Sequence, residues 1–233
     1  MFGPILGAIS ALTYYTLAVR PWLLRWGATA EEVSTLLPGD DLVPEVRYAT
    51  TRAVTVRASA ESIWPWLVQL GQARAGFYTY DRLAQIVGAA IRSADRVVPE
   101  FQQLAVGDTV LLSPVGGPKV ALLDPGRALV LSQTMDLRTG QSITPVPPTR
   151  WAMDWTWTFA LRPLSDGATR LLVRTRADYR PRAVLAPVVR LLLEPIHFVM
   201  ERGMLMGIKR RAEHAATVPA NITADPSLPA TIL

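Results

Sequence analysis

Two stretches decide the fold: TRAVTVRASAESIWPWLVQLGQARAGFYTYDRL, residues 51–83, and EPIHFVMERGMLMGIKRRAE, residues 194–213. The first begins with alternating apolar and polar residues, which is typical of a half-buried strand. Ser59 then suits the N-cap of a helix, and Gly71 suits its end. In the second stretch, apolar residues recur at the i, i+3, i+4, i+7 spacing of one long helix. We also expect a second short helix over residues 79–87.

The chain between these stretches has the pattern of β-strands. Short apolar runs separated by Gly and Pro predict strands at residues 110–113, 119–123 and 128–133. The clearest strand covers residues 151–161, where six large apolar side chains fall on one face. The pair Asp166-Gly167 then makes a turn, and residues 170–179 return as the hairpin partner. An apolar face of that size must be covered by core, ligand or membrane.

The returning strand carries a row of arginines opposite its apolar residues: Arg170, Arg174, Arg176 and Arg180. Charged residues on one face of an antiparallel hairpin most simply coat a solvated face, and this is what we expect here. An anion-binding row is the alternative.

The composition excludes several classes of site. There is no cysteine, which excludes disulfides, zinc–thiolate sites and cysteine nucleophiles. The net charge of +5 comes almost wholly from arginine, because Lys119 and Lys209 are the only lysines. This charge is spread along the chain, whereas a nucleic-acid-binding protein concentrates it beside stacking aromatic residues. We therefore expect no nucleic-acid partner, and attraction to an anionic membrane better accounts for the excess.

The N-terminal residues 2–19 contain no charged residue. As a helix they would be about 27 Å long, just enough to cross a hydrocarbon core. Basic residues follow this run, at Arg20 and Arg25, instead of preceding it, which favours an uncleaved anchor over a secretory signal. The positive-inside rule then places the following domain on the cytoplasmic side. The alternative is a helix that packs on the protein and never enters lipid.

The order of strand, two helices, antiparallel strands and long C-terminal helix resembles the helix-grip fold over roughly residues 50–215. It is similar to the START-like superfamily (SRPBCC), which includes polyketide cyclase/dehydrase-like and lipid-transfer domains. The most specific parts are ASAESIW, residues 58–64, and the helix from Met200 to Glu213, while WPWLVQLGQ, residues 64–72, resembles a bacterial branch. The resemblance implies an α+β domain whose curved antiparallel sheet wraps on the C-terminal helix, with a hydrophobic cavity between them. It carries over no catalytic residue, because members share a shape and not a motif.

These patterns divide the chain into four parts. Residues 1–27 are an apolar helix and possible membrane anchor, and residues 28–50 are a linker. Residues 51–216 form the helix-grip ligand-binding domain, and residues 217–233 form a disordered tail.

Large apolar side chains and helix glycines are the candidates for the cavity wall. They are Trp64, Phe77, Tyr78, Trp155, Trp157, Met200, Gly203, Met204 and Gly207. Tryptophan and methionine suit this role because they present large, adaptable apolar surface. Gln69 would orient a polar ligand head, with loop hydrogen bonding as the alternative. For any single wall residue, ordinary core is the competing interpretation.

Candidates for acid–base chemistry are Asp154, Tyr78, Tyr80 and Asp81. Facing inward, Asp154 would be a buried carboxylate with a raised pKa, the kind of group that transfers protons. Facing outward, it would pair with a strand arginine. The apolar face of its strand should take the interior, so the outward position is favoured.

One of the two histidines, His197, has Glu194 three residues before it and Glu201 four residues after it. This spacing suits a partial metal site or a surface ion-pair cluster. One helix supplies at most three ligands, so we expect the surface ion pairs, with no metal and no cofactor.

The first functional hypothesis is a non-enzymatic, membrane-associated carrier or sensor of an apolar ligand such as a lipid, isoprenoid or polyketide. The second is an enzyme of the cyclase/dehydrase type that acts in the same cavity. The third is an interaction module tethered at the membrane, with the arginine row as its docking face.

Overall fold

The computed structural model describes residues 3–79, 93–114, 116–143 and 151–217. The helix expected over residues 79–87, with Tyr80 and Asp81, lies outside these residues, except for Thr79. The tail expected from residue 217 also lies outside them, except that Thr217 ends the last helix.

The five strands form one antiparallel sheet in the order β1-β5-β4-β3-β2. Their bounds are β1 Tyr48–Val56, β2 Lys119–Asp124, β3 Ala128–Asp136, β4 Ala152–Pro163 and β5 Thr169–Arg180. The predicted hairpin of β4 and β5 is present, with Trp157 opposite Thr175. Its turn is closed by Asp166, whose side chain accepts a hydrogen bond from Ala168 N, and by Gly167 at a positive φ of 81°.

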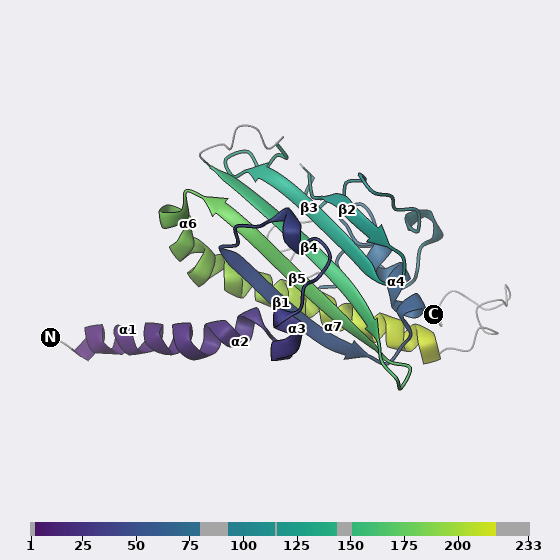
Figure 1. Ribbon diagram of the computed structural model, residues 1–233, viewed down its shortest axis with the longest axis horizontal. Helices are drawn as coiled ribbons and strands as arrows, with labels where there is room; N and C mark the ends of the chain where they lie inside the picture. Colours follow the sequence, from purple (N-terminus) through teal and green to yellow (C-terminus); the bar gives the residue numbers. More distant parts are fainter. Residues whose placement is uncertain (1–2, 80–92, 115, 144–150, 218–233) are drawn as a thin grey trace.

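Two helices cover the inner face of the sheet. Helix α4 (Ala60–Val68) begins at the predicted N-cap Ser59, whose side chain accepts from the backbone N–H of Ser62. Helix α7 (Glu194–Thr217) is the predicted long C-terminal helix, and it crosses behind the sheet (Figure 1). A short 3₁₀-helix, η3 (Pro99–Phe101), lies between α4 and β2. The α+β architecture predicted from the sequence is confirmed.

One apolar core joins the sheet to α4 and α7. It includes Val56, Ile63, Leu67, Phe159, Leu171, Leu205 and Ile208. Burying each side chain of this size contributes about 1.5–3 kcal/mol. Helix α7 also approaches the segment after α4 closely, since a Cβ on Gly207 would lie 2.0 Å from the carbonyl oxygen of Tyr78.

The sheet is also covered on its outer face. Residues 27–43, here called the strap, cross that face and contain α3 (Ala30–Ser34) and the 3₁₀-helix η2 (Asp40–Leu42) (Figure 1). Leu37 of the strap packs with Ala53, Ala160 and Leu172 in a second, smaller core.

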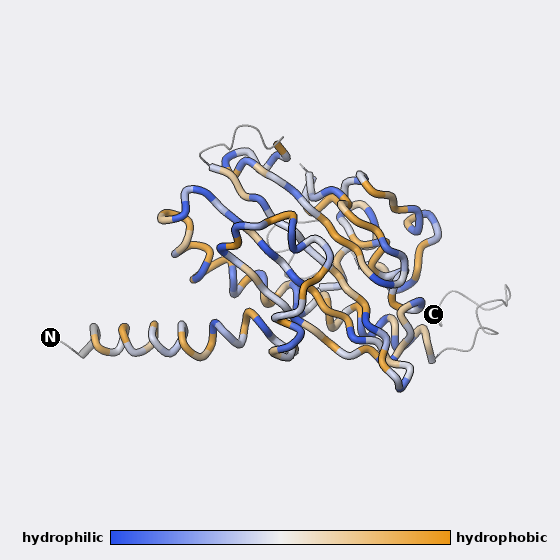
Figure 2. The backbone as a smooth tube through the Cα atoms, viewed as in Figure 1, coloured by the Kyte–Doolittle hydropathy of each residue, from blue (hydrophilic) through white to orange (hydrophobic). Residues whose placement is uncertain are grey.

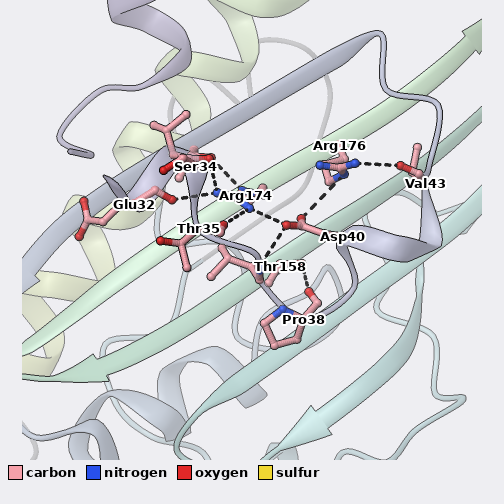
Figure 3. A network of polar contacts seen from close by, with 12 residues as sticks. Glu32, Ser34, Thr35, Pro38, Asp40, Val43, Thr158, Arg174 and Arg176 are labelled. Carbon is pink, nitrogen blue, oxygen red and sulfur yellow. Dashed lines mark hydrogen bonds and ion pairs between the residues drawn. The ribbon is translucent and has the colours of Figure 1, made fainter. Parts of the chain in front are cut away.

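Arg174 joins the strap to the sheet. Its guanidinium lies 2.6 Å from Asp40 Oδ2 and donates hydrogen bonds to the carbonyl oxygens of Glu32, Val33 and Thr35 (Figure 3). Only 4% of Arg174 is exposed. The expectation that the arginine row coats a solvated face is therefore wrong for Arg174, because the strap supplies a carboxylate and the carbonyl groups that a buried guanidinium needs.

The N-terminal segment forms α1 (Gly3–Tyr14), the π-helical turn η1 (Tyr15–Val19) and α2 (Arg20–Leu24). Helix α1 projects away from the domain (Figure 1). Near the same end, α6 (Arg182–Val188) and the π-helical turn η4 (Val189–Leu193) run directly into α7.

Candidate ligand cavity

A cavity of about 260 Å³ lies between the sheet and α7. Strand β4 supplies Trp155 and Trp157, and α7 supplies His197, Met200, Glu201 and Met204. Phe77 and Thr79 come from the segment after α4, and Leu112 comes from the segment before β2. Alternation on β4 and the i, i+3, i+4, i+7 spacing on α7 turn these side chains to the same space.

The polar end of the cavity is built around Glu201. Its Oε2 accepts from Arg52 Nη1 at 2.5 Å, and its Oε1 accepts from Trp157 Nε1 at 2.9 Å. His197 Nε2 lies 3.2 Å from Oε1, and both charged side chains of the Arg52–Glu201 pair are 0% exposed. Burial alone would raise the pKa of Glu201, but His197 and Arg52 outweigh it and lower that pKa to about 2. Glu201 is therefore a carboxylate at neutral pH.

His197 is held on both sides of its ring. Its Nδ1 lies 2.6 Å from the hydroxyl of Tyr48, and burial raises the pKa of that tyrosine, which keeps the hydroxyl protonated. The carboxylate of Glu201 can only accept, so His197 carries a proton on Nε2. In a neutral ring with this tautomer, Nδ1 accepts from the Tyr48 O–H. Glu201 and Tyr48 thus fix both the orientation and the tautomer of His197.

Most polar groups on the cavity wall have hydrogen-bond partners, and Trp155 Nε1, which is buried without one, is the exception. Glu201 has Arg52, Trp157 and His197 as partners, and Thr79 Oγ1 donates to the carbonyl oxygen of Met200. A polar group buried without a hydrogen-bond partner costs about 1–3 kcal/mol. An apolar molecule in this space would leave neither Glu201 nor Thr79 unpaired.

The cluster around His197 differs from the expected surface ion pairs. Glu194 and Glu201 are 1% and 2% exposed, so the surface location is wrong, although the ion pairs are present. Glu194 pairs with Arg20, at 2.7 Å, instead of with His197. Within the described ranges, no three His, Asp or Glu side chains converge as a metal site would require.

The structure brings five of the predicted wall residues together around the cavity: Phe77, Trp155, Trp157, Met200 and Met204. The other predicted residues do not line it. Trp64 is half-buried against the main core, while Gly203 and Gly207 are buried on α7.

Gln69 and Tyr78 do not line the cavity; they form a hydrogen-bonded pair beside it. Gln69 Nε2 donates to the Tyr78 hydroxyl at 2.8 Å, and that hydroxyl donates to the carbonyl oxygen of Trp66. Gln69 Oε1 accepts from the backbone N–H of Val98 at 2.9 Å. These contacts match the loop hydrogen bonding that was the alternative for Gln69.

Asp154 lies on the outer face of β4, as the alternation favoured. Its carboxylate is 3.9 Å from Arg180 Nη2, and Asp178 sits opposite it on β5. It is absent from the cavity wall.

The sequence interpretation missed the roles of Arg52, Tyr48, Thr79 and Leu112. A signal existed for Arg52, because it shares the inward face of β1 with Val54 and Val56. An arginine in an apolar stripe implies a buried acidic partner. Tyr48, Thr79 and Leu112 carry no comparable pattern.

A curved antiparallel sheet closed by a long C-terminal helix, with a cavity between them, defines the helix-grip arrangement. The chain has the helix-grip fold that the sequence predicted. No family model matches the sequence, and no curated protein matches it.

Solved structures with a similar fold share little sequence with this helix-grip chain. The di-domain ARO/CYC StfQ from the steffimycin biosynthetic pathway is 16% identical, with a TM-score of 0.42, and the match covers 77% of this chain and 55% of that one. A Thalictrum norcoclaurine synthase is 15% identical, with a TM-score of 0.39, over 73% of this chain and 96% of that one. The Aha1 protein of Colwellia psychrerythraea is 18% identical, with a TM-score of 0.37, over 71% and 96%.

Within the described part of the chain, one continuous helix, Arg182–Thr217, is long and apolar enough to cross a membrane. Length and composition are weak evidence for a span, and the C-terminal half of this helix packs in the core through Met204, Leu205 and Ile208.

Proposed function

We propose that this protein binds a small apolar molecule in the helix-grip cavity and holds it at a membrane. The observation that carries the proposal is the cavity itself, a mostly apolar space in which Glu201 and Thr79 of the wall already have hydrogen-bond partners. Trp155 Nε1 is the exception among the wall groups, because it is buried without a hydrogen-bond partner. Aromatic and methionine side chains from β4 and α7 supply its dispersion contacts.

The size of the cavity limits the ligand. A space of about 260 Å³ equals the volume of about nine water molecules in the liquid, at about 30 Å³ each. Sites for drug-sized ligands run from roughly 300 to 1,000 Å³. A compact ring system or a single short chain therefore suits the space better than a phospholipid with two chains.

The same wall favours binding over acid–base catalysis. Both ring nitrogens of His197 are occupied, by Tyr48 and Glu201, so neither is free to meet a substrate proton. Asp154 lies on the outer face of the sheet, away from the ligand. A carrier or sensor role needs only the apolar walls.

Membrane association is supported by the exposed apolar side chains of α1. Leu6, Ile9 and Leu12 are 53–62% exposed, and none of the residues from 6 to 14 is charged. A helix that is apolar on every side requires lipid or protein around it. We therefore propose that residues 2–19 anchor the domain to the bilayer.

Titration with N-phenyl-1-naphthylamine, an apolar dye that fluoresces when it leaves water, tests the cavity. Met204→Trp replaces a flexible side chain of the cavity wall by a larger, rigid indole ring. Because this ring takes up space in the cavity, we expect the variant to bind the dye at least tenfold more weakly. Met206→Trp is the matched control, because Met206 is on the same helix and absent from the wall. Equal dye binding by all three proteins would overturn the proposal.

A further inference from the structure

We propose that the bilayer supplies the cavity directly, through the N-terminal end of α7 and the turn η4. This inference rests on the proposed ligand binding and adds the source of the ligand and the surface that meets it. It assigns to residues 184–199 a role in contact with lipid.

Two adjacent stripes on this helix carry the argument. Leu193, His197, Met200 and Met204 follow one another at i, i+4, i+7 and i+11, and the last three line the cavity. The stripe of Leu192, Ile196 and Val199 lies one residue earlier, about 100° around the helix. Leu192, Ile196 and Val199 are 42–54% exposed.

The wall of the cavity thus continues into exposed apolar surface. Leu193, at the end of the cavity-lining stripe, is itself 48% exposed. An apolar molecule that moves along this helix between surface and cavity would meet Leu193, Met200 and Met204 instead of water, with His197 as the polar member of the stripe.

Many of the exposed large apolar side chains belong to two regions that contact each other, which together we call the apolar end. From the C-terminal region they are Val184, Val188, Leu191, Leu192, Leu193, Ile196 and Val199, and from the N-terminal region Leu6, Ile9, Leu12 and Leu17. Figure 2 shows apolar residues along α6 and at intervals along α1. Large exposed apolar surfaces mark sites of contact with protein or membrane.

Side-chain contacts fix the two regions to each other. The Tyr15 hydroxyl donates to the carbonyl oxygen of Arg190 at 2.6 Å, and Arg20 forms a two-bond ion pair with Glu194. The rings of Trp22 and Phe198 lie 5.1 Å apart. A membrane anchor in α1 would therefore hold residues 184–199 close to the same bilayer.

The charges at the apolar end favour an anionic lipid surface over a second copy of the chain. Residues 1–30 and 179–193 contain no acidic residue, and Glu194 is neutralised by Arg20. Arg25 and Arg190 are exposed beside the apolar side chains. Two copies meeting through this end would bring like charges together, whereas anionic headgroups would attract them.

Stopped-flow transfer of N-phenyl-1-naphthylamine from vesicles to the full chain tests this inference, using phosphatidylcholine with phosphatidylglycerol at 7:3. We expect the transfer rate to rise with vesicle concentration, as collision requires. The double variant Ile196→Glu/Val199→Glu should slow transfer at least tenfold while its dye affinity in vesicle-free buffer stays within twofold of wild type. Leu36→Glu is the control, since Leu36 is 84% exposed away from this helix.

Each outcome separates the two proposals. Wild-type transfer rates in the double variant, or rates independent of vesicle concentration, would overturn the bilayer as source while leaving ligand binding intact. A lipid-free dimer that the double variant abolishes would assign the stripe to a second copy and also overturn it. Failure of the wild type to bind the dye in buffer would overturn the proposed function itself. If the double variant is unfolded by circular dichroism, the single variant Leu192→Glu takes its place under the same criteria.

Discussion

Glu201 of α7 and Arg52 of β1 meet at 2.5 Å with no exposure of either side chain, and this buried pair forms the polar end of the cavity. The pair joins the gripping helix to the edge of the sheet across 149 residues of sequence. Arg52 also donates to the carbonyl oxygen of Leu23, so the N-terminal segment is fixed at the same point. The Arg52–Glu201 pair therefore connects the wall of the cavity, α7 and the N-terminal segment.

Removing one member of this pair should be strongly destabilising, because the other charge remains buried without compensation. We expect Glu201→Gln to lower the free energy of unfolding by about 3–5 kcal/mol, measured by urea denaturation. The double variant Arg52→Met/Glu201→Leu should cost less than the sum of its two single changes. Glu45→Gln is the control: its exposed pair with Arg182 should contribute less than about 1 kcal/mol. Additive single effects would contradict this account.

The same pair should make stability depend on pH in the acidic range. The pKa of Glu201 is lowered to about 2 in the folded state, so its contribution is complete above the unfolded value of about 4.3 and is lost as pH falls toward 2. The shift corresponds to about 3 kcal/mol. We expect the difference in unfolding free energy between wild type and Glu201→Gln to shrink between pH 5 and pH 2. A difference that stays constant over this range would contradict the assignment.

Gly207 should not tolerate a side chain. A Cβ there would meet the carbonyl oxygen of Tyr78 at 2.0 Å, so α7 must shift or the segment after α4 must move. We expect Gly207→Ala to lower the melting temperature, with a cost of about 1–3 kcal/mol or more. Gly7→Ala is the matched helical control, because no atom lies within 4 Å of its added Cβ, and it should be neutral or slightly stabilising. Equal melting temperatures for the two variants would show that the close approach is absent.

Arg174 should matter more than its neighbour Arg176, although both belong to the same row. Arg174 holds Asp40 at 2.6 Å with three strap carbonyl groups, whereas Arg176 Nε lies 3.8 Å from Asp40 and remains 23% exposed. We expect Arg174→Met to cost about 3–5 kcal/mol and to expose the strap to limited proteolysis. Arg176→Met should cost less and leave the strap protected. The reverse order would contradict the role given to Arg174.

Much of the fold follows from local sequence patterns. Ser59 predicts the start of α4, and the alternation of apolar and polar residues from residue 151 predicts β4. Asp166-Gly167 predicts the turn to β5. The helix start, the strand and the turn each depend on residues only a few positions apart, so a local sequence pattern is enough to predict them. The same alternation placed Trp155 and Trp157 on the inner face and Asp154 on the outer face.

Local patterns could not predict the polar end of the cavity or the strap, because both depend on ion pairs between residues far apart in sequence. The position of Arg52 among apolar residues indicates burial, but only the fold shows that Glu201 is its partner. Arg174 looks solvent-exposed until the strap covers it. The spacing of Glu194, His197 and Glu201 correctly indicated ion pairs. It did not indicate that Arg20 and Arg52 would be the partners.

Native mass spectrometry of the full chain, extracted in detergent from its producing cells, tests the central claim most directly. We predict one small apolar molecule bound per chain, recovered by organic extraction and absent from the Met204→Trp variant. A clean ligand-free mass, with no uptake from a panel of small apolar molecules, would contradict the account and leave the space between β4 and α7 as packed core.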